Sequence, residues 1–329
     1  MISNKTILIP GSSPISLLYS LLCAQFGLKV ILLGKSPYGG AWQKTDQNRI
    51  DPRIPVSTHI LMHSEGLQRL LSEIQYKAAP WQLDPLEIDE KGTVLGNFAV
   101  SDTGLSIGNV SGKTDLLEFL KSQVNCQENI SFQSKWADKI TIGNSVDISC
   151  SDGSRVSGDG LIISSGIICD MFLNGKKINA STKCYDVITL RIIFSKRDFL
   201  PETFLHFKGK GSLIRELQVL KIENKCVLLA KLGRVAKTAK AFDIEQNLHW
   251  LVKKYFEVKI NNQQIKYFKY ENSRRYFDIP KPEYAKAPMI IPARIFSDDK
   301  AEENLISQDI SKSFLDLTTV KNTILQKLT

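Results

Sequence analysis

The pattern of apolar and polar residues near the start of the chain shows two kinds of segment, which are short continuous apolar runs and a longer stretch with apolar residues at helical spacing. Residues 5–10 and 29–33 are short runs rich in aliphatic and β-branched side chains, which is typical of buried strands. Between them, residues 15–25 carry apolar positions at helical spacing, and Gly27 is placed to end that helix. With a turn at residues 11–14, the order strand, turn, helix, strand predicts a βαβ unit whose strands pair in parallel.

Farther along, the pattern predicts more strands of this first part and then a separate sheet, which begins near Tyr185. Asp152 and Gly153 separate two apolar runs, which indicates a hairpin turn within a three-stranded antiparallel insertion. The expected strands are residues 129–134, 139–143, 146–156, 160–166, 187–194, 225–232 and 264–271. The expected helices are residues 65–74, 114–123, 244–256 and 309–328.

Positive charge is concentrated in the middle of the 329-residue chain. The net charge is +9, and residues 171–300 contain 26 Lys and Arg against 13 Asp and Glu. This excess favours a small anionic substrate or an acidic surface as partner, or it forms a solvated lysine-rich face. Because the charge is diffuse and includes no arginine-rich run, a nucleic-acid partner is not expected.

Other classes of protein fit the sequence poorly. No run approaches the roughly 18 apolar residues of a membrane span, and Pro10 breaks the first apolar run too early for a signal peptide. The six cysteines lie far apart and there are only four histidines, so we expect neither a metal site nor a disulfide framework. The cysteines are expected to be small core residues of a protein in the reducing cytoplasm.

The turn after the first strand is the strongest chemical signal. Dinucleotide-binding βαβ units read GxGxxG at this point, so that the backbone can approach a pyrophosphate at the N-terminus of the helix. The three positions are Gly11, Ser13 and Ser16, all of them small. The acidic residue that would bind a ribose hydroxyl after the second strand is replaced by Gly34. The pattern therefore predicts a nucleotide-binding turn with substituted glycines and no ribose carboxylate.

With this turn, later segments resemble the two-domain flavoproteins of the amine oxidase, protoporphyrinogen oxidase, renalase and UDP-galactopyranose mutase group. Residues 39–42 (GGAW) are similar to the double-glycine element of this family, and residues 58–63 (THILMH) to a histidine-containing segment of the mutases. Residues 158–166 (GDGLIISSG) are similar to a later strand of the cofactor domain, and residues 270–280 to the strand by which the cap returns to it. Asp298-Asp299 stand where the family has Gly-Asp before its last helix.

The resemblance implies an α/β fold, in which a Rossmann-like FAD/NAD(P)-binding domain carries a second α+β substrate (cap) domain built on an antiparallel sheet. The cofactor domain would be discontinuous, comprising residues 1–75, 110–170 and 290–329, with the cap at residues 76–109 and 171–289. The implied cofactor is FAD. Its implied binding residues are Gly11, Ser12, Ser13, Ser16, Gly34, Lys35, Gly39, Gly40, Ala41, Trp42, Ser164, Ser165, Gly166, Asp298, Asp299 and Ile306.

The implied activity is transfer of a hydride from a small anionic or amine-bearing substrate to the flavin. His59 and His63 would lie near the flavin ring in this family, and Arg274 and Arg275 have guanidinium forks suited to a carboxylate or phosphate. These four residues are the candidate catalytic residues. Two alternatives stay open. The substituted glycines fit a catalytically inactive protein that uses the fold to bind or scaffold a protein partner, and residues 58–63 fit a flavin-dependent sugar mutase without net redox.

Overall fold

The computed structural model covers the whole chain and describes its sheets and the helices that pack on them. The described residues are 5–34, 60–62, 74–75, 79–80, 86–89, 91, 93–97, 107–109, 116–163, 169–209, 211–222, 224–233, 236, 238–277, 287, 289–290 and 322.

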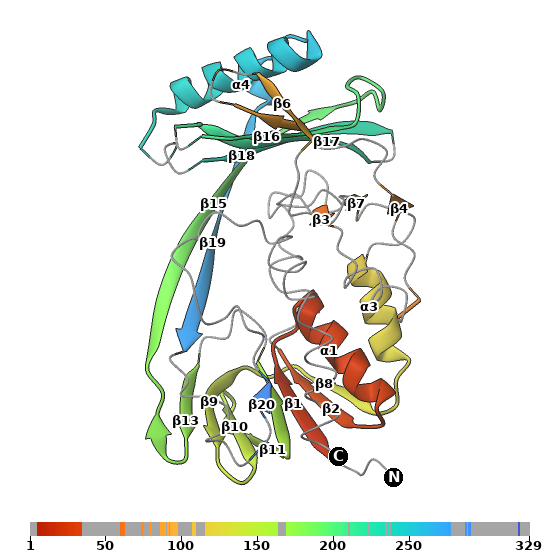
Figure 1. Cartoon of the computed structure of the whole chain (residues 1–329), viewed down its shortest axis with the longest axis vertical. Coiled ribbons are helices and arrows are strands. Elements are labelled where there is room, and N and C mark those ends of the chain that lie inside the picture. The colour runs from red at the N-terminus through yellow and green to blue at the C-terminus, as the bar shows by residue number, and fades with distance from the viewer. Residues whose placement is uncertain are drawn as a thin grey trace.

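A five-stranded parallel sheet lies at one end of the molecule (Figure 1). Its strands are β1 (Thr6–Pro10), β2 (Lys29–Leu33), β8 (Ile130–Gln133), β12 (Gly160–Ile162) and β20 (Met289–Ile290). Their order is β20-β12-β1-β2-β8, and every neighbouring pair is parallel. The chain therefore builds outward from β1 on one side and then on the other, which is the strand order of nucleotide-binding α/β sheets. The predicted βαβ opening is confirmed.

Two helices pack beside this sheet, α1 (Pro14–Gln25) and α3 (Leu116–Asn125). Apolar side chains of α1, among them Leu17, Leu18 and Leu22, are almost fully buried against strand residues such as Ile7 and Val30. The helix ends where predicted, because Gly27 has a φ of +73° that favours glycine.

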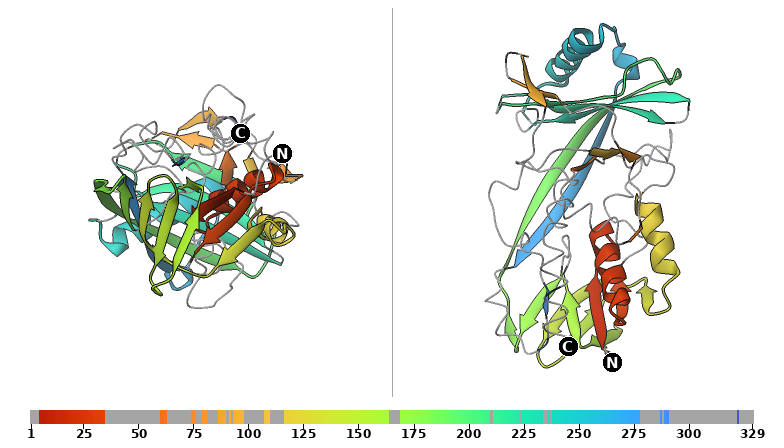
Figure 2. Two further views of the ribbon diagram at one scale, coloured as in Figure 1. Left: turned by 90° about the horizontal axis from the view of Figure 1, so that it is seen from below. Right: turned by 45° about the vertical axis from the view of Figure 1, so that its right-hand side comes forward.

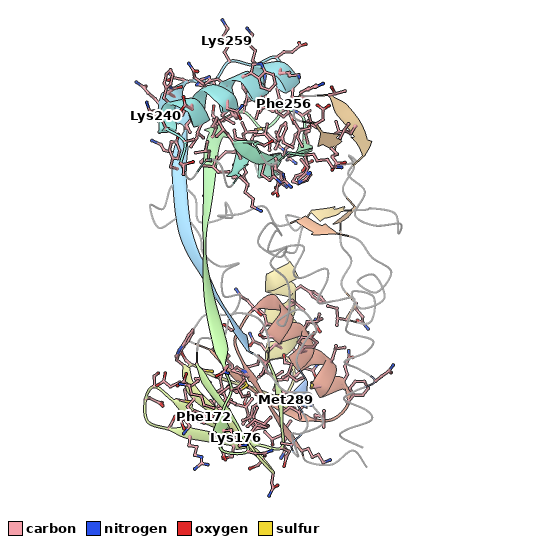
Figure 3. The ribbon with its side chains drawn as sticks, turned by 60° about the vertical axis from the view of Figure 1, so that its left-hand side comes forward. Phe172, Lys176, Lys240, Phe256, Lys259 and Met289 are labelled. Atoms are coloured by element: carbon pink, nitrogen blue, oxygen red, sulfur yellow. The ribbon has the colours of Figure 1, made fainter. Side chains whose placement is uncertain are left out.

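A second sheet continues from the same end of the molecule. It contains β9 (Ala137–Ile142), β10 (Val146–Cys150), β11 (Arg155–Gly158), β13 (Asp170–Leu173) and β14 (Lys176–Lys177), in the order β11-β10-β9-β13-β14. The predicted hairpin turn is present between β10 and β11, with Gly153 at a φ of +79°. Figure 3 shows Phe172 of β13 and Lys176 of β14 in the same part of the molecule as Met289 of β20. The expected boundary of the cap at residue 171 thus falls inside a strand of this sheet.

A seven-stranded sheet lies at the opposite end (Figure 1). Its order is β19-β15-β18-β17-β16-β5-β6, with only the pair β16–β5 parallel. The strands are β5 (Leu86–Ile88), β6 (Val94–Asn97), β15 (Ala180–Phe194), β16 (Thr203–Phe207), β17 (Ile214–Ile222), β18 (Lys225–Leu232) and β19 (Lys266–Phe277). Strands β15 and β19 are long, and they run as a two-stranded ribbon from this sheet toward the other end of the molecule (Figures 1 and 2).

The helix α4 (Ala241–Phe256) covers the outer side of the seven-stranded sheet (Figures 1 and 2). A short 3-10 helix (Asn262–Gln264) leads from it toward β19. A small sheet of β3 (Ile60–Met62), β7 (Ile107–Asn109) and β4 (Ala79–Pro80) lies between the two ends.

The expectation of a separate sheet from about Tyr185 is confirmed by the seven-stranded sheet, whereas the expected three-stranded insertion is part of a five-stranded sheet, because β13 pairs in parallel with β9. The expected helices at residues 114–123 and 244–256 correspond to α3 and α4. The expected helices at residues 65–74 and 309–328 fall almost wholly outside the described residues. Of the five cysteines whose side chains are described, four are buried and Cys126 is exposed, and all five are free thiols. Among the described helices, none combines the length and apolar character needed to cross a bilayer.

Candidate functional site

The turn after β1 has the conformation that a glycine-rich nucleotide turn requires. Gly11 has a φ of +116°, which residues with a β carbon rarely adopt. Its amide donates a 2.6 Å hydrogen bond to the carbonyl oxygen of Leu33 at the end of β2. The turn is therefore held against the carboxyl end of the neighbouring strand, which is where ligands bind in sheets of this order.

The helix α1 starts directly after this turn and is capped by a serine. Ser13 is the N-cap residue, and its Oγ accepts a 3.3 Å hydrogen bond from the amide of Ser16. Pro14 follows at the first helical position and has no amide hydrogen to donate. Ser16 is fully buried, with its Oγ 3.1 Å from the Oγ of Ser13. The first turn contains no acidic residue, so nothing in it opposes an anion at the positive end of the helix.

At the carboxyl ends of β1 and β2, Gly34 closely approaches Ser12. A β carbon at Gly34 would lie 2.9 Å from the Ser12 Oγ and 3.0 Å from its Cβ. The Gly34 amide donates to the carbonyl oxygen of Gln133 in β8. The Ser12 hydroxyl therefore occupies the space into which the usual carboxylate side chain would extend, which gives a physical reason for the missing acid.

The side of the seven-stranded sheet opposite α4 is unexpectedly polar. Side chains of a strand alternate between the two faces of its sheet. On the outer face, Leu190, Leu217 and Leu228 pack with α4 residues such as Leu248 and Val252 in one apolar cluster. The alternate residues of the same strands therefore lie on the opposite face. That face of the sheet is turned toward the rest of the molecule (Figure 1). The residues on it include Glu87, Arg191, His206, Glu216, Gln218 and Lys231.

Four of these residues form an inner polar row, consisting of Lys231, Glu216, His206 and Glu87. They sit at paired register positions on β18, β17, β16 and β5. The Lys231 Nζ lies 3.4 Å from the Glu216 Oε1, and the His206 Nδ1 lies 4.0 Å from the Glu87 Oε1. The Glu216 side chain is only 2% exposed and that of Lys231 19%. Moving a charged side chain out of water costs several kcal/mol per ion, and a buried ion pair often adds little net stability. The row therefore needs an explanation other than stability.

Two further inward residues lie beside the row. Arg191 is 2% exposed and Gln218 is 1% exposed. Both pair in register with Leu229 of β18, from opposite sides. Among the described residues, the Gln218 Oε1 has no hydrogen-bond partner. An acceptor buried in this way favours a ligand that brings an N–H or O–H group.

His206 carries no charge at neutral pH. Its burial lowers the imidazole pKa to about 4, and the nearby cations Arg215, Lys231 and Lys208 add to this shift. Glu87, at the limit of ion-pair distance, does not outweigh them. The inner face therefore presents a neutral imidazole beside the buried Arg191, the partly buried Lys231 and the buried Glu216 carboxylate.

Only some of the predicted site residues fall within the described structure. Gly11, Ser12, Ser13, Ser16 and Gly34 come together around the start of α1. Arg274 and Arg275 are successive residues of β19, in the ribbon between the two sheets, and pair with Lys183 and Thr182. The others lie outside the described residues: His59, His63, Lys35, Gly39, Gly40, Ala41, Trp42, Ser164, Ser165, Gly166, Asp298, Asp299 and Ile306.

Sequence reasoning missed the inner polar row. The signal that could have found it is a polar or charged residue at alternate positions of an otherwise apolar run, as at His206 and Glu216. Within the described part of the chain, no three His, Cys, Asp or Glu residues gather as metal ligands would.

Comparison with known proteins identifies the fold by structure rather than by sequence. No protein-family model matches the chain, and no curated protein matches its sequence. The structure is similar to p-nitrophenol 4-monooxygenase PnpA from Pseudomonas putida DLL-E4, with a TM-score of 0.59 and 11% identity over 98% of this chain and 80% of that one. It is also similar to a putrescine oxidase variant redesigned in cofactor binding, with a TM-score of 0.64 and 9% identity over 98% and 99% of the two chains. A third similar structure is 2-methyl-3-hydroxypyridine-5-carboxylic acid oxygenase, with a TM-score of 0.58 and 9% identity over 97% and 82%.

Proposed function

We propose that this chain is an FAD-dependent oxidoreductase, which oxidises a small anionic or amine-bearing substrate by hydride transfer to the flavin. The observation that carries the proposal is the left-handed Gly11 turn, which joins β1 to the N-terminus of α1 at the centre of the parallel sheet. The similar structures named above are a monooxygenase, an oxygenase and an oxidase redesigned in cofactor binding, which supports an oxidoreductase that uses a bound cofactor. In this proposal residues 1–75, 110–170 and 290–329 hold the cofactor, and residues 76–109 and 171–289 form the cap.

The residues around the turn fit the pyrophosphate of the cofactor. The backbone at Gly11 leaves room for close approach, the Ser13 hydroxyl is a donor for a phosphate oxygen, and the positive end of α1 favours the phosphate charge. At the ribose end the usual carboxylate is absent. The Ser12 hydroxyl, beside Gly34, is the group that would meet a ribose hydroxyl there.

The bound flavin would supply the redox chemistry, as cofactors of this kind do. The protein would supply binding and charge. Arg191 and Lys231 on the inner face would attract an anionic group of the substrate, and the Gln218 Oε1 would accept a hydrogen bond from its N–H or O–H. The neutral His206 would accept or donate a hydrogen bond to the substrate without adding charge. Arg274 and Arg275 and the segment that contains His59 and His63 remain candidates for the same site.

The first experiment is the visible absorption spectrum of the purified protein, before and after addition of FAD. The variant Ser13→Asp then tests whether the FAD lies at the start of α1. Aspartate is as good an N-cap as serine and its charge suits the start of a helix, so α1 should stay folded. The same charge would repel a pyrophosphate, so we expect FAD affinity to fall at least tenfold, about 1.4 kcal/mol. Lys240→Asp is the matched control, because Lys240 is the N-cap residue of α4 and makes no side-chain capping bond.

Binding of FAD by the native protein and the Lys240→Asp variant, with loss in Ser13→Asp, is the expected result. If both variants bind FAD as the native protein does, the cofactor does not lie at α1 and the site is wrong. If the protein is colourless after incubation with excess FAD and removal of the unbound FAD, the proposed function is wrong.

One observation favours a second candidate, a protein of this fold that no longer binds FAD and instead binds a partner. The amide of Ser16 is already satisfied by the Ser13 Oγ, and Pro14 has no amide hydrogen, so α1 is capped without a ligand. The spectrum separates the two candidates, because only the first gives a yellow protein.

A further inference from the structure

A pocket of about 290 Å³ lies where α4 crosses the ends of β5 and β16 and the start of β17. Its lining includes Phe207, Trp250, Tyr255, Asp89, Asn247 and Ser212. Its lining residues Phe207, Ile214 and Leu251 belong to the apolar cluster between the sheet and α4, on the side of the sheet that α4 covers in Figures 1 and 2. The inner polar row lies on the opposite face of the same strands. The pocket is thus separate from the site described above.

Aromatic rings form much of the wall of this pocket. The ring centroids of Phe207 and Tyr255 lie 6.0 Å apart, with the rings inclined by 57°. Trp250 contributes the third ring and remains 50% exposed, although it is one of the largest apolar side chains. Aromatic faces carry negative electrostatic potential and attract cations.

The charge of the pocket has the same sign. Among the described residues that line it, Asp89 is the only charged one. Its Oδ1 accepts hydrogen bonds from the amides of Lys91 and Thr93, which fix the carboxylate at the end of β5. Burial raises the pKa of the Tyr255 phenol, and the negative charge of Asp89 raises it further. The described lining of the pocket thus carries one negative charge and no positive charge of its own.

One ammonium group already lies against these rings. The Lys254 Nζ is 4.8 Å from the ring centroid of Trp250 and 5.4 Å from that of Tyr255. Lys254 is not among the described residues that line the pocket, but its ammonium group contacts two rings that are, those of Trp250 and Tyr255. The wall is therefore suited to an alkylammonium group, and Lys254 shows how such a group is held.

We propose that this pocket binds the alkylammonium group of a small organic cation, and that Lys254 competes with the ligand for the Trp250 and Tyr255 rings. The apolar substituents of the cation would contact the aromatic wall, and Asp89 would balance its charge. The proposal does not depend on the function proposed for the parallel sheet.

The test is titration of the full chain with choline, followed by calorimetry, and with its neutral isostere 3,3-dimethylbutan-1-ol. A cation–π contact strengthens the binding of a cation roughly two- to thirtyfold, so we expect choline to bind roughly tenfold more tightly than the alcohol. Trp250→Leu should weaken choline binding by a similar factor, and Asp89→Asn should weaken it while keeping the turn acceptor. Lys254→Gln should strengthen it. Trp136→Leu is the matched control, because Trp136 is also partly exposed, at 37%, but lies just before β9.

Saturable binding of choline to the native protein or to Lys254→Gln, lost in Trp250→Leu and kept in Trp136→Leu, supports the proposal. Three results would overturn it. They are equal affinity for choline and the neutral alcohol, an equal effect of the two tryptophan substitutions, and no saturable binding by either the native protein or Lys254→Gln. Circular dichroism of each variant checks that α4 remains folded.

Discussion

Replacing Gly34 by alanine tests the close approach at the end of the parallel sheet. The new β carbon would meet the Ser12 Oγ at 2.9 Å, the Ser12 Cβ at 3.0 Å and the Phe132 ring at 3.5 Å. The hydroxyl can rotate away, but the Ser12 Cβ is fixed to the backbone, so the turn itself must shift. Overpacking of this kind costs about 1–3 kcal/mol, and the stiffer unfolded chain returns about 0.5 kcal/mol. We expect Gly34→Ala to lower the free energy of unfolding by about 1–2 kcal/mol.

The assay is a double-mutant cycle measured by urea unfolding of the protein without added cofactor. Ser12→Gly removes both contacting atoms of Ser12, so Gly34→Ala in that background should keep only the gain of about 0.5 kcal/mol from the stiffer unfolded chain. The expected coupling between the two substitutions is therefore the overpacking cost itself, about 1–3 kcal/mol. Gly143→Ala is the matched control, because a β carbon there meets no atom within 4 Å. Its effect should stay within about 0.5 kcal/mol.

Additive effects of Ser12→Gly and Gly34→Ala, within about 0.5 kcal/mol, would refute the reasoning. The contact would then not exist at the strength described. The steric explanation for the missing ribose carboxylate would fail with it.

Two further predictions concern the inner polar row, and one repeats the cofactor test above. Glu216→Leu leaves the Lys231 ammonium without its carboxylate at a site that is only 19% exposed, so it should lower the free energy of unfolding by roughly 3 kcal/mol. The double variant Glu216→Leu with Lys231→Met should lose much less stability, because no unpaired charge remains. Denaturant unfolding of the two variants measures both values. The pKa of His206 is about 4 in the folded chain, below its ordinary value of 6.5. The unfolded chain therefore binds more protons between these two values, so stability should fall as pH drops from about 6.5 to 4, by up to roughly 3 kcal/mol. His206→Gln should lose this part of the pH dependence, which melting curves at pH 7 and pH 4.5 would show; an unchanged dependence would mean that His206 is not buried in its neutral form. Ser13→Asp should weaken FAD binding without unfolding α1, whereas Lys240→Asp should leave FAD binding unchanged.

Local sequence patterns predicted those elements whose burial follows a simple rule. The βαβ opening was predicted because β1 and β2 are buried on both faces and read as continuous apolar runs, and because Gly27 ends the helix between them. The pattern missed β16 and β17. In these strands, His206, Glu216 and Gln218 alternate with apolar residues as the exposed side of a surface strand does, yet all three are buried.

The two halves of the candidate site differ in the same way. The Gly11 turn and α1 are contiguous in sequence, so a motif could predict them. The inner polar row depends on strand register, which brings Glu87, His206, Glu216 and Lys231 together from four separate strands. Nothing in the local sequence around Glu87 indicates that it will lie beside residues more than a hundred positions later.

The strand order has a consequence for how the chain folds. The edge strand β20 pairs with β12 through Leu161 and Met289, so the parallel sheet is completed only after the whole intervening segment is in place. The seven-stranded sheet in turn takes β5 and β6 from residues that precede most of the parallel sheet. The strands of the two sheets are thus interleaved along the sequence, so each sheet needs contacts between residues far apart in the chain. Such contacts slow folding. We expect the two sheets to form as one slow cooperative unit, and a fragment that ends before residue 289 to leave the edge of β12 open to aggregation.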